Sequence, residues 1–132
     1  MLNKYIVSPA DDVPLDAEWR IVPHNKNYEV SEYGHVRRLA PGSGAIPGKL
    51  LKPYKTGGRY FKYDLQLNKY NNKQKAHRLV ALTFIGNPNL SPCVLHNDGN
   101  VDNCHYSNLR WGNQVDNYQD SLRHGTRNHK RI

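Results

Sequence analysis

The residues VLHNDGNVDNCHYSNLRW, Val94–Trp111, crowd Asn, Asp and His side chains between an aliphatic beginning and a Leu-Arg-Trp end. Turns favour Asn, Asp and Gly, so this composition by itself fits an ordinary surface loop. The order of the residues, and of the elements around them, has to distinguish a plain loop from a functional one.

The flanking residues predict a strand, a loop, a second strand and a helix. Cys93–His96 and Leu109–Trp111 are short runs typical of strands, with the polar loop between them. Asn113 is then a suitable N-cap for a helix over about 114–124, which has an apolar stripe and a closing glycine: Val115, Tyr118, Leu122 and Gly125. Such a helix brings Asn117 back beside the first strand.

Two hairpins are predicted upstream of this unit. Tyr28–Val30 and His35–Leu39 are strand candidates joined by a tight turn that ends at Gly34. Tyr60–Leu67 alternates apolar and polar residues, as a half-buried strand does. A turn at Tyr70, Asn71 and Asn72 and a return strand over 73–77 complete the second hairpin.

The apolar residues of His77–Ile85 predict a buried helix that Gly86 closes. The whole pattern predicts an α+β fold, in which short β-hairpins and a buried helix precede the strand-loop-strand-helix unit. We divide the chain into an irregular arm (1–18), a small hairpin module with a Gly/Pro-rich connector (19–56), a main domain (57–125, core 93–124) and a basic tail (126–132).

Basic residues outnumber acidic ones and gather in two parts of the chain. The 132 residues include 19 Lys and Arg against 11 Asp and Glu, for a formal net charge of +8. Ten of the basic residues lie between Arg37 and Lys75, where Asp64 is the single acid, and four more follow Asp120. This concentration of positive charge favours a polyanionic partner, nucleic acid first.

The sequence also indicates a reducing compartment. Cys93 and Cys104 form no Cys-x-x-Cys pair, which excludes a four-cysteine zinc site. No secretory segment follows Met1, and no apolar run approaches membrane-spanning length. We therefore expect a cytoplasmic protein with no membrane partner.

The spacing of His96, Asn108 and Asn117 resembles the signature of the HNH endonucleases, whose ββα-metal unit has a His ending the first strand, an Asn at the second strand and an Asn or His on the helix. Asn108 follows His96 by twelve residues, and Asn117 follows Asn108 by nine. Other segments resemble parts of phage and homing-type members, including their N-terminal nuclease-associated modular domain: HRLVALTFIGNP, DSLRHGT and WRIVPHNKNYEVSEYGHVRRL.

The resemblance implies a role for each of the three residues. His96 would be the general base that deprotonates water, and Asn117 would offer an amide oxygen to a divalent cation, Mg²⁺ or Mn²⁺. Asn108 would hold the loop and orient the His96 ring through hydrogen bonds. The chemistry agrees, since phosphodiester hydrolysis needs a base and a cation that neutralises the charge developing around phosphorus.

Leu95 departs from the family pattern, because the position before the base is often a metal-ligating Asp. The resemblance then leaves Asp98 as the carboxylate nearest in sequence that could reach the ion, with Asp102 as a weaker substitute. Asp98 could equally be a turn residue before a left-handed Gly99.

Double-stranded DNA is the partner that the resemblance implies. Arg110 lies on the strand beside the site and is the first candidate contact. The remaining candidates are basic residues expected to bind phosphates without reading sequence: Arg37, Arg38, Lys52, Lys55, Arg59, Arg123 and Arg127.

We expect a metal-dependent DNA endonuclease that leaves a 5′ phosphate and a 3′ hydroxyl. A monomer with one such site would nick one strand, and a homodimer would be needed for symmetric double-strand cleavage. Two alternatives stay open: a DNA-binding protein with a decayed site, suggested by Leu95, and a zinc-stabilised binding module built from Cys93, Cys104, His96 and His105.

Overall fold

Alternating residues build the central hairpin of the computed structural model, which describes residues 6–41, 46–67, 70–87 and 89–124. Strand β4 (Lys62–Leu67) pairs antiparallel with β5 (Tyr70–Lys75), and the core-facing Tyr63 and Leu65 are buried while Asp64 is exposed. The predicted turn at 70–72 is wrong. These residues lie within β5, because the antiparallel ladder extends to the pair Leu67↔Tyr70 and supplies their backbone partners.

An N-terminal sheet of three antiparallel strands packs beneath this hairpin. Its order is β1 (Trp19–Ile21), β2 (Tyr28–Ser31) and β3 (Val36–Arg38), of which β1 was not predicted. The tight turn between β2 and β3 is confirmed: the Gly34 amide donates to the Ser31 carbonyl at 3.0 Å, and Gly34 has φ +100°. A left-handed conformation of this kind favours glycine.

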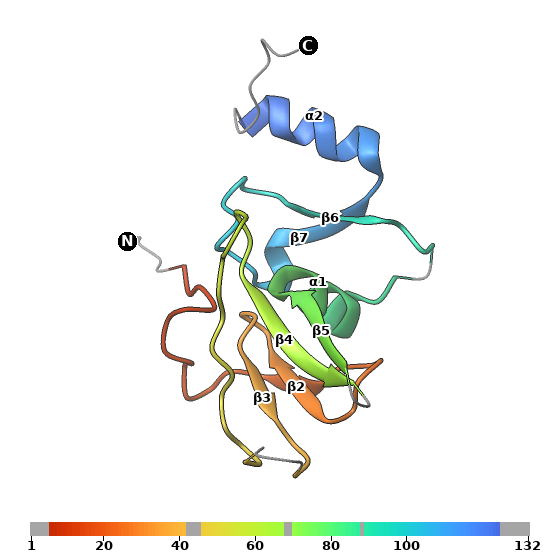
Figure 1. Ribbon diagram of the computed structural model, residues 1–132. Coiled ribbons are helices and arrows are strands. Elements are labelled where there is room, and N and C mark those ends of the chain that lie inside the picture. Colours follow the sequence, from red (N-terminus) through yellow and green to blue (C-terminus); the bar gives the residue numbers. More distant parts are fainter. Residues whose placement is uncertain (1–5, 42–45, 68–69, 88, 125–132) are drawn as a thin grey trace.

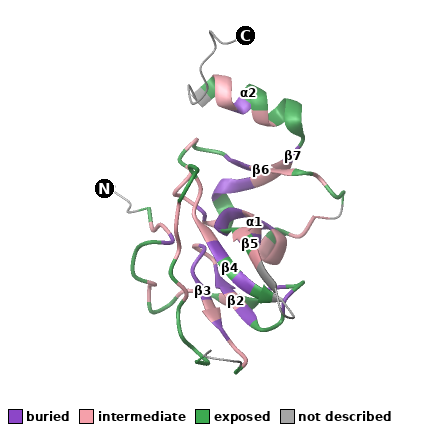
Figure 2. Cartoon of the chain, viewed as in Figure 1, coloured by how far each residue is buried: buried purple, intermediate pink, exposed green. Residues whose placement is uncertain are grey.

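One hydrophobic core joins the N-terminal sheet to the rest of the molecule. Figure 2 shows buried residues concentrated in β2, β4 and α1. The core cluster includes Val30 and Val36 from the sheet, Tyr63 and Leu65 from β4, and Leu79 from α1 (Ala76–Val80). The segments 19–56 and 57–124 therefore share a core.

The predicted buried helix is present, and its second half is wider than an ordinary α-helix. Helix α1 continues into the π-helical turn η1 (Ala81–Ile85), and Gly86 ends it with φ +80°. In Figure 1, α1 lies between the β4–β5 hairpin and the C-terminal unit.

The C-terminal unit is the predicted strand-loop-strand-helix. Strand β6 (Cys93–His96) pairs antiparallel with β7 (Leu109–Gly112), a short 3₁₀ turn η2 (Tyr106–Asn108) precedes β7, and α2 (Gln114–His124) packs on both strands. The predicted N-cap is confirmed: the Asp116 amide donates to Asn113 Oδ1 at 2.8 Å, and the Asn113 amide donates to Asp116 Oδ2 at 3.1 Å.

The apolar stripe of this helix does not enter the core as its spacing suggested. Val115 is 61% exposed and Tyr118 is 43% exposed. The reason is geometric, because α2 lies over a sheet of only two strands at one end of the molecule (Figure 1). Within the described residues, no helix is long and apolar enough to cross a membrane.

Candidate active site

Asn108 organises the loop between β6 and β7. Its side chain is buried; its amide nitrogen donates to Asp98 Oδ1 (2.9 Å) and to the Asn103 carbonyl (3.0 Å), and its oxygen accepts from the Asp98 amide (3.0 Å). The Asn108 carbonyl also accepts from the Asn97 amide at 2.7 Å. Both side-chain N–H groups are thus used within the loop, so Asn108 has no donor left for the His96 ring. The predicted loop-holding role fits this geometry, and the predicted hydrogen bond to His96 does not.

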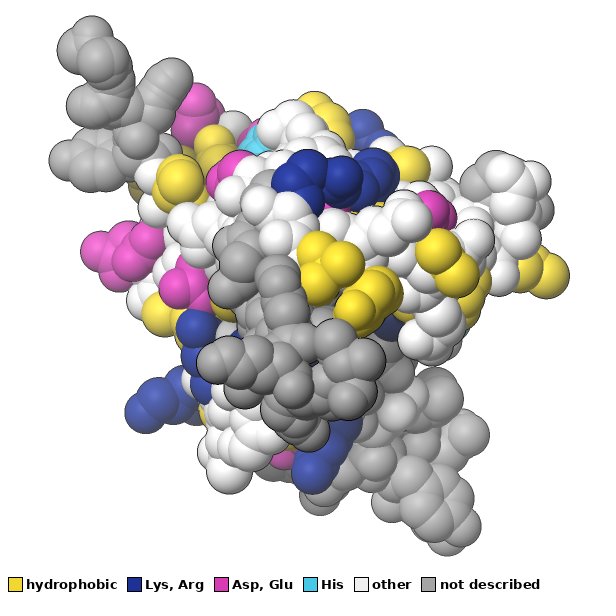
Figure 3. All heavy atoms as spheres, turned by 90° about the horizontal axis from the view of Figure 1, so that it is seen from above, with side chains coloured by type: hydrophobic (Ala, Val, Ile, Leu, Met, Phe, Trp, Pro, Cys, Tyr) yellow, Lys and Arg dark blue, Asp and Glu magenta, His cyan; other side chains and the backbone are white. Residues whose placement is uncertain are grey.

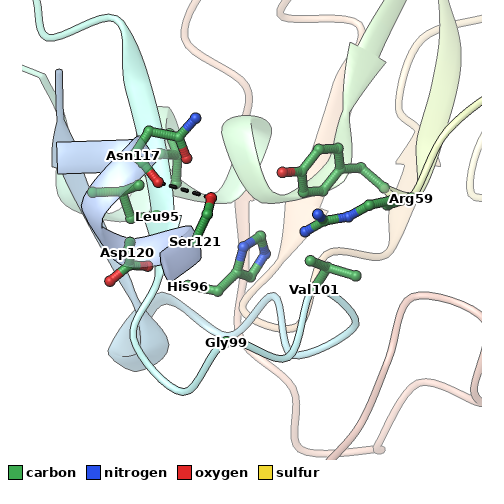
Figure 4. Close-up of a pocket in the computed structure, with 10 residues that line it drawn as sticks. Arg59, Leu95, His96, Gly99, Val101, Asn117, Asp120 and Ser121 are labelled. Atoms are coloured by element: carbon green, nitrogen blue, oxygen red, sulfur yellow. Dashed lines mark hydrogen bonds between the residues drawn. The ribbon is translucent and has the colours of Figure 1, made fainter. Parts of the chain in front are cut away.

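A small pocket lies where strand β6, the loop that follows it, helix α2 and the segment before β4 meet (Figure 4). Its volume is about 50 Å³, which suits a hydrated ion or one or two waters. Residues from all four parts line it: Arg59, Tyr60, Val94, Leu95, His96, Gly99, Val101, Asn117, Asp120 and Ser121. The structure therefore brings His96 and Asn117 to one cavity, as predicted.

The His96 ring is held by stacking. The Tyr60 ring lies parallel to it, with centroids 6.0 Å apart and an interplanar angle of 9°, and the His77 ring lies 4.7 Å from it. His96 is only 6% exposed, and its Nε2 has no hydrogen-bond partner among the described residues. Because burial disfavours the charged ring, the pKa of His96 is lowered to about 4.

Asn117 lies in the first half of α2, where the capped N-terminus sets its position. Its amide donates to the Asn113 carbonyl at 3.0 Å, and its carbonyl accepts from Ser121 Oγ at 2.9 Å (Figure 4). The Asn117 side chain lines the pocket and offers an amide oxygen, a ligand type that hard divalent cations accept.

Asp98 stabilises the loop between β6 and β7. Its carboxylate accepts hydrogen bonds from the Asn100 amide (2.8 Å), Asn103 Nδ2 (2.9 Å) and Asn108 Nδ2. Burial would raise the pKa of Asp98, but these hydrogen bonds outweigh it and the pKa lies below its usual value. Gly99 has φ +75°, as expected for a turn. Asp98 is not among the residues that line the pocket, so its predicted metal role stays a prediction without geometric support.

Leu95 occupies a pocket wall next to His96. It is 2% exposed, and a Cβ placed on Gly112 would lie 2.6 Å from Leu95 Cδ1. The leucine therefore fills the space that the glycine leaves, and it contributes an apolar surface where the family pattern often has a carboxylate.

Asp120 is the carboxylate that does line the pocket. It lies three residues after Asn117 on α2 and is buried. Its Oδ1 accepts from Arg110 Nη2 at 2.9 Å and from Arg123 Nη2 at 2.5 Å. The Arg110 pair ties α2 to strand β7, while the Arg123 pair lies within α2.

The basic residues predicted to contact DNA have different surroundings. The Arg59 guanidinium points into the pocket toward His96 (Figure 4). Arg37 pairs with Glu29 at 2.7 Å, Lys55 pairs with Asp102 at 2.6 Å, and Lys52 is exposed. Arg127 lies outside the described residues.

Arg38 has surroundings that do not suit a DNA contact. It is 7% exposed, and its guanidinium donates to the Tyr28 hydroxyl (2.9 Å) and to the Ala40 carbonyl. A buried cation is tolerated only with such partners, and here they hold it inside the N-terminal sheet. The predicted DNA contact of Arg38 therefore stays a prediction without geometric support.

The zinc-stabilised alternative is also corrected. The described residues, which include Cys93, Cys104, His96 and His105, contain no group of three or more His, Cys, Asp or Glu side chains that could hold a metal ion. Cys104 is buried in the core cluster, while the His105 ring contacts Glu32 Oε1 at 3.0 Å and Ser107 Oγ at 2.8 Å.

Sequence reasoning missed three residues of the site. Tyr60 and His77 pack on the His96 ring from segments distant in sequence, and no local signal points to them. Asp120 could have been found, because its place three residues after Asn117 puts the two side chains on one face of the predicted helix.

Comparisons with known proteins agree with this geometry. The chain is 36% identical over 110 residues to an uncharacterized HNH endonuclease of Acanthamoeba polyphaga mimivirus, and 32% identical over 112 residues to DNA endonuclease I-HmuI of Bacillus phage SP01. The alignments cover 82% and 84% of this chain, but only 31% and 61% of those relatives.

A solved structure is similar as well. The structure that describes DNA binding and cleavage by the HNH homing endonuclease I-HmuI matches with a TM-score of 0.70 and 31% identity, over 84% of this chain and 61% of that one. No family model matches the chain. The structural match confirms the α+β class with a ββα unit.

Proposed function

Because this chain belongs to the HNH endonuclease family, we propose that it is a metal-dependent DNA endonuclease with His96 as its general base. The chain spans about a third and about three-fifths of the lengths of the two relatives.

The observation that carries the proposal is the state of the His96 ring. Its lowered pKa keeps the imidazole neutral near pH 7, its buried Nε2 has no hydrogen-bond partner among the described residues, and His96 is part of the lining of a pocket that can hold water. A neutral ring nitrogen with no competing donor can accept a proton from an attacking water. Stacking by Tyr60 and His77 fixes the direction in which that nitrogen points.

Asn117 is the proposed ligand of a divalent cation, Mg²⁺ or Mn²⁺. Mg²⁺ commonly keeps several waters and takes only one or two protein oxygens together with substrate phosphates, and the oxygen donors of this pocket fit that demand. When bound, the cation would stabilise the charge that builds up on the phosphate and on the leaving 3′ oxygen.

Arg59 is proposed to hold the reacting phosphate. Its guanidinium lies 5.2 Å from the Tyr60 ring centroid and points toward His96, so a phosphate next to His96 would meet a positive charge already in place (Figure 4). Bidentate contacts of this kind orient phosphates well.

Double-stranded DNA is the proposed substrate. The net charge of +8 suits a polyanion, and Figure 3 shows several Lys and Arg side chains gathered on the α2 end of the molecule. Exposed Lys52 and the ion-paired Arg37, Lys55, Arg110 and Arg123 are proposed to contact phosphates, as is Arg127.

The proposed reaction transfers a proton from water to His96 Nε2 as the water oxygen bonds to phosphorus and the bond from phosphorus to the 3′ oxygen breaks. The leaving 3′ oxygen takes a proton from a solvent water. The products are a 5′ phosphate and a 3′ hydroxyl. With one site per chain, a monomer nicks one strand. We propose that it acts in the cytoplasm where its DNA target lies.

One observation favours a second candidate. Leu95 places an apolar, 2% exposed side chain beside the base, so a DNA-binding protein with a decayed catalytic site is the alternative.

A plasmid assay separates the two. Supercoiled plasmid is incubated with wild type, His96→Ala and the exposed-histidine control His24→Ala, in EDTA, Mg²⁺ or Mn²⁺. An endonuclease should give nicked DNA from wild type and His24→Ala in metal only, and a loss of about 10²–10⁴-fold in His96→Ala. Intact but gel-shifted plasmid in every lane would instead identify the binding protein.

A further inference from the structure

We propose that Asp120 supplies the carboxylate of the metal site, in the place that Leu95 leaves without one. This inference rests on the proposed function, since it names a second protein ligand for the cation that Asn117 is proposed to hold. It concerns a residue that the family signature does not include.

The position of Asp120 on α2 suits a metal ligand. Asn117 and Asp120 are three positions apart, and side chains with that spacing lie on the same face of a helix. Both line the pocket that also contains His96. A pair of helix side chains three apart is an arrangement that proteins use for metal ligands.

The chemistry of the available donors also favours Asp120. A hard divalent cation prefers oxygen ligands, and Asp120 is the carboxylate among the lining residues of this pocket. Asp98, the nearest carboxylate in sequence to His96, is engaged by three hydrogen-bond donors of its own loop and does not line the pocket.

An unpartnered buried nitrogen of a lining residue supports the same site. His96 is part of the lining of this cavity, and its Nε2 is buried without a hydrogen-bond partner within the described part of the chain. Buried polar atoms usually have a partner, and a cation-bound water at the 50 Å³ pocket would supply one.

Two arginines compete for the same carboxylate. Arg110 and Arg123 both contact Asp120 Oδ1. Each arginine is also proposed to bind DNA phosphate. A bound duplex would therefore draw the two guanidinium groups away from Asp120 as it brings a phosphate to the pocket. Removal of one arginine should therefore strengthen cation binding rather than weaken it.

The test measures Mn²⁺ binding by the full chain, from the loss of the free-ion electron paramagnetic resonance signal during titration. Wild type should show one site with a Kd on the order of 1 mM or tighter. Asp120→Asn should weaken Mn²⁺ binding at least tenfold. The asparagine keeps a side-chain oxygen that can accept from the arginines, so α2 stays anchored. Circular dichroism verifies that each variant is folded.

Two comparison variants test whether the loss of binding is specific to the Asp120 carboxylate. Asp102→Asn removes the same charge from a carboxylate that also acts electrostatically on His96 but does not line the pocket, and it should change the Kd less than about twofold. Arg110→Gln removes the pair that joins α2 to β7 and should leave Mn²⁺ binding equal to wild type or tighter. If Asp120 served only to anchor the helix, Arg110→Gln would weaken binding as Asp120→Asn does.

The outcomes separate this inference from the proposed function. Absence of a wild-type Mn²⁺ site, equal binding by wild type and Asp120→Asn, or equal losses in Asp120→Asn and Asp102→Asn would each overturn it, even if the plasmid is cleaved. Mn²⁺ binding that depends on Asp120 would support it even where wild type leaves plasmid intact, in which case the endonuclease proposal fails alone.

Discussion

At the scale of single residues, Asn108 shows how one side chain can hold a whole loop. Its three side-chain hydrogen bonds join both ends of the segment between β6 and β7, and the side chain is buried. A group buried in this way leaves several partners unsatisfied when it is removed.

We therefore expect Asn108→Ala to lower the free energy of unfolding by about 2–4 kcal/mol. It should also reduce cleavage, because the loop carries His96 at its first end. Urea unfolding followed by fluorescence measures the first effect. Asn103→Ala, which removes one hydrogen bond to Asp98, is the matched control and should cost about 1 kcal/mol. Equal stabilities of the two variants would contradict this role for Asn108.

At the scale of elements, α2 is an unusual helix for a small fold. Its apolar residues Val115 and Tyr118 are largely exposed, so burial contributes less to its stability than the stripe suggested. The reciprocal cap between Asn113 and Asp116 and the ion pairs of Asp120 hold it instead. Positioning of Asn117 depends on these polar contacts.

Asn113→Ala should therefore act on both stability and activity. Loss of the cap is expected to cost about 1 kcal/mol of unfolding free energy. Because the first turn of α2 would fray and Asn117 lies in the next one, nicking of plasmid should fall more than global stability explains. Gln119→Ala, an exposed change on the same helix, serves as the control and should alter neither quantity. Unchanged nicking by folded Asn113→Ala would refute the link.

At the scale of the whole molecule, buried histidines couple stability to pH. Burial lowers the pKa of His77 well below its usual value, with the charges of His96, Lys75 and Arg78 adding to the effect, and the Tyr60 ring packs on the same imidazole. Burial also lowers the pKa of His35. In the unfolded chain both groups take up protons near pH 6.5, while in the folded chain they stay neutral.

The contribution of these histidines to the free energy of unfolding should therefore be fully present above about pH 6.5. It should fall as the pH drops toward their folded-state pKa values, since the unfolded state then binds more protons than the folded state. Each such histidine contributes a slope of about 1.4 kcal/mol per pH unit within that window. Urea midpoints at several pH values measure the slope. His77→Phe keeps a ring in place and should reduce the slope by about one histidine's share; identical slopes would show that His77 does not contribute.

The sequence alone predicted a large part of the local structure. The limits of β6 and α2, the presence of β7, the Asn113 cap and the turn at Gly34 follow from residues a few positions apart, and each is confirmed, with β7 one residue longer than predicted. Those patterns reflect backbone hydrogen bonds and side-chain periodicity, which act over short sequence distances. The failures arose where long-range pairing decides: β1, and the strand residues at 70–72.

The sequence by itself determined the family, the order of strands and helix, and the placing of His96 and Asn117 at one site. Only the tertiary structure decided which charges face that site. In the folded chain, Arg38 is buried next to Tyr28, and the Arg59 guanidinium points toward His96. Asp98 accepts hydrogen bonds within its own loop, and Asp120 lines the pocket. Burial and charge pairing depend on contacts between segments far apart in the chain, such as Lys55 with Asp102, and no local pattern encodes those contacts.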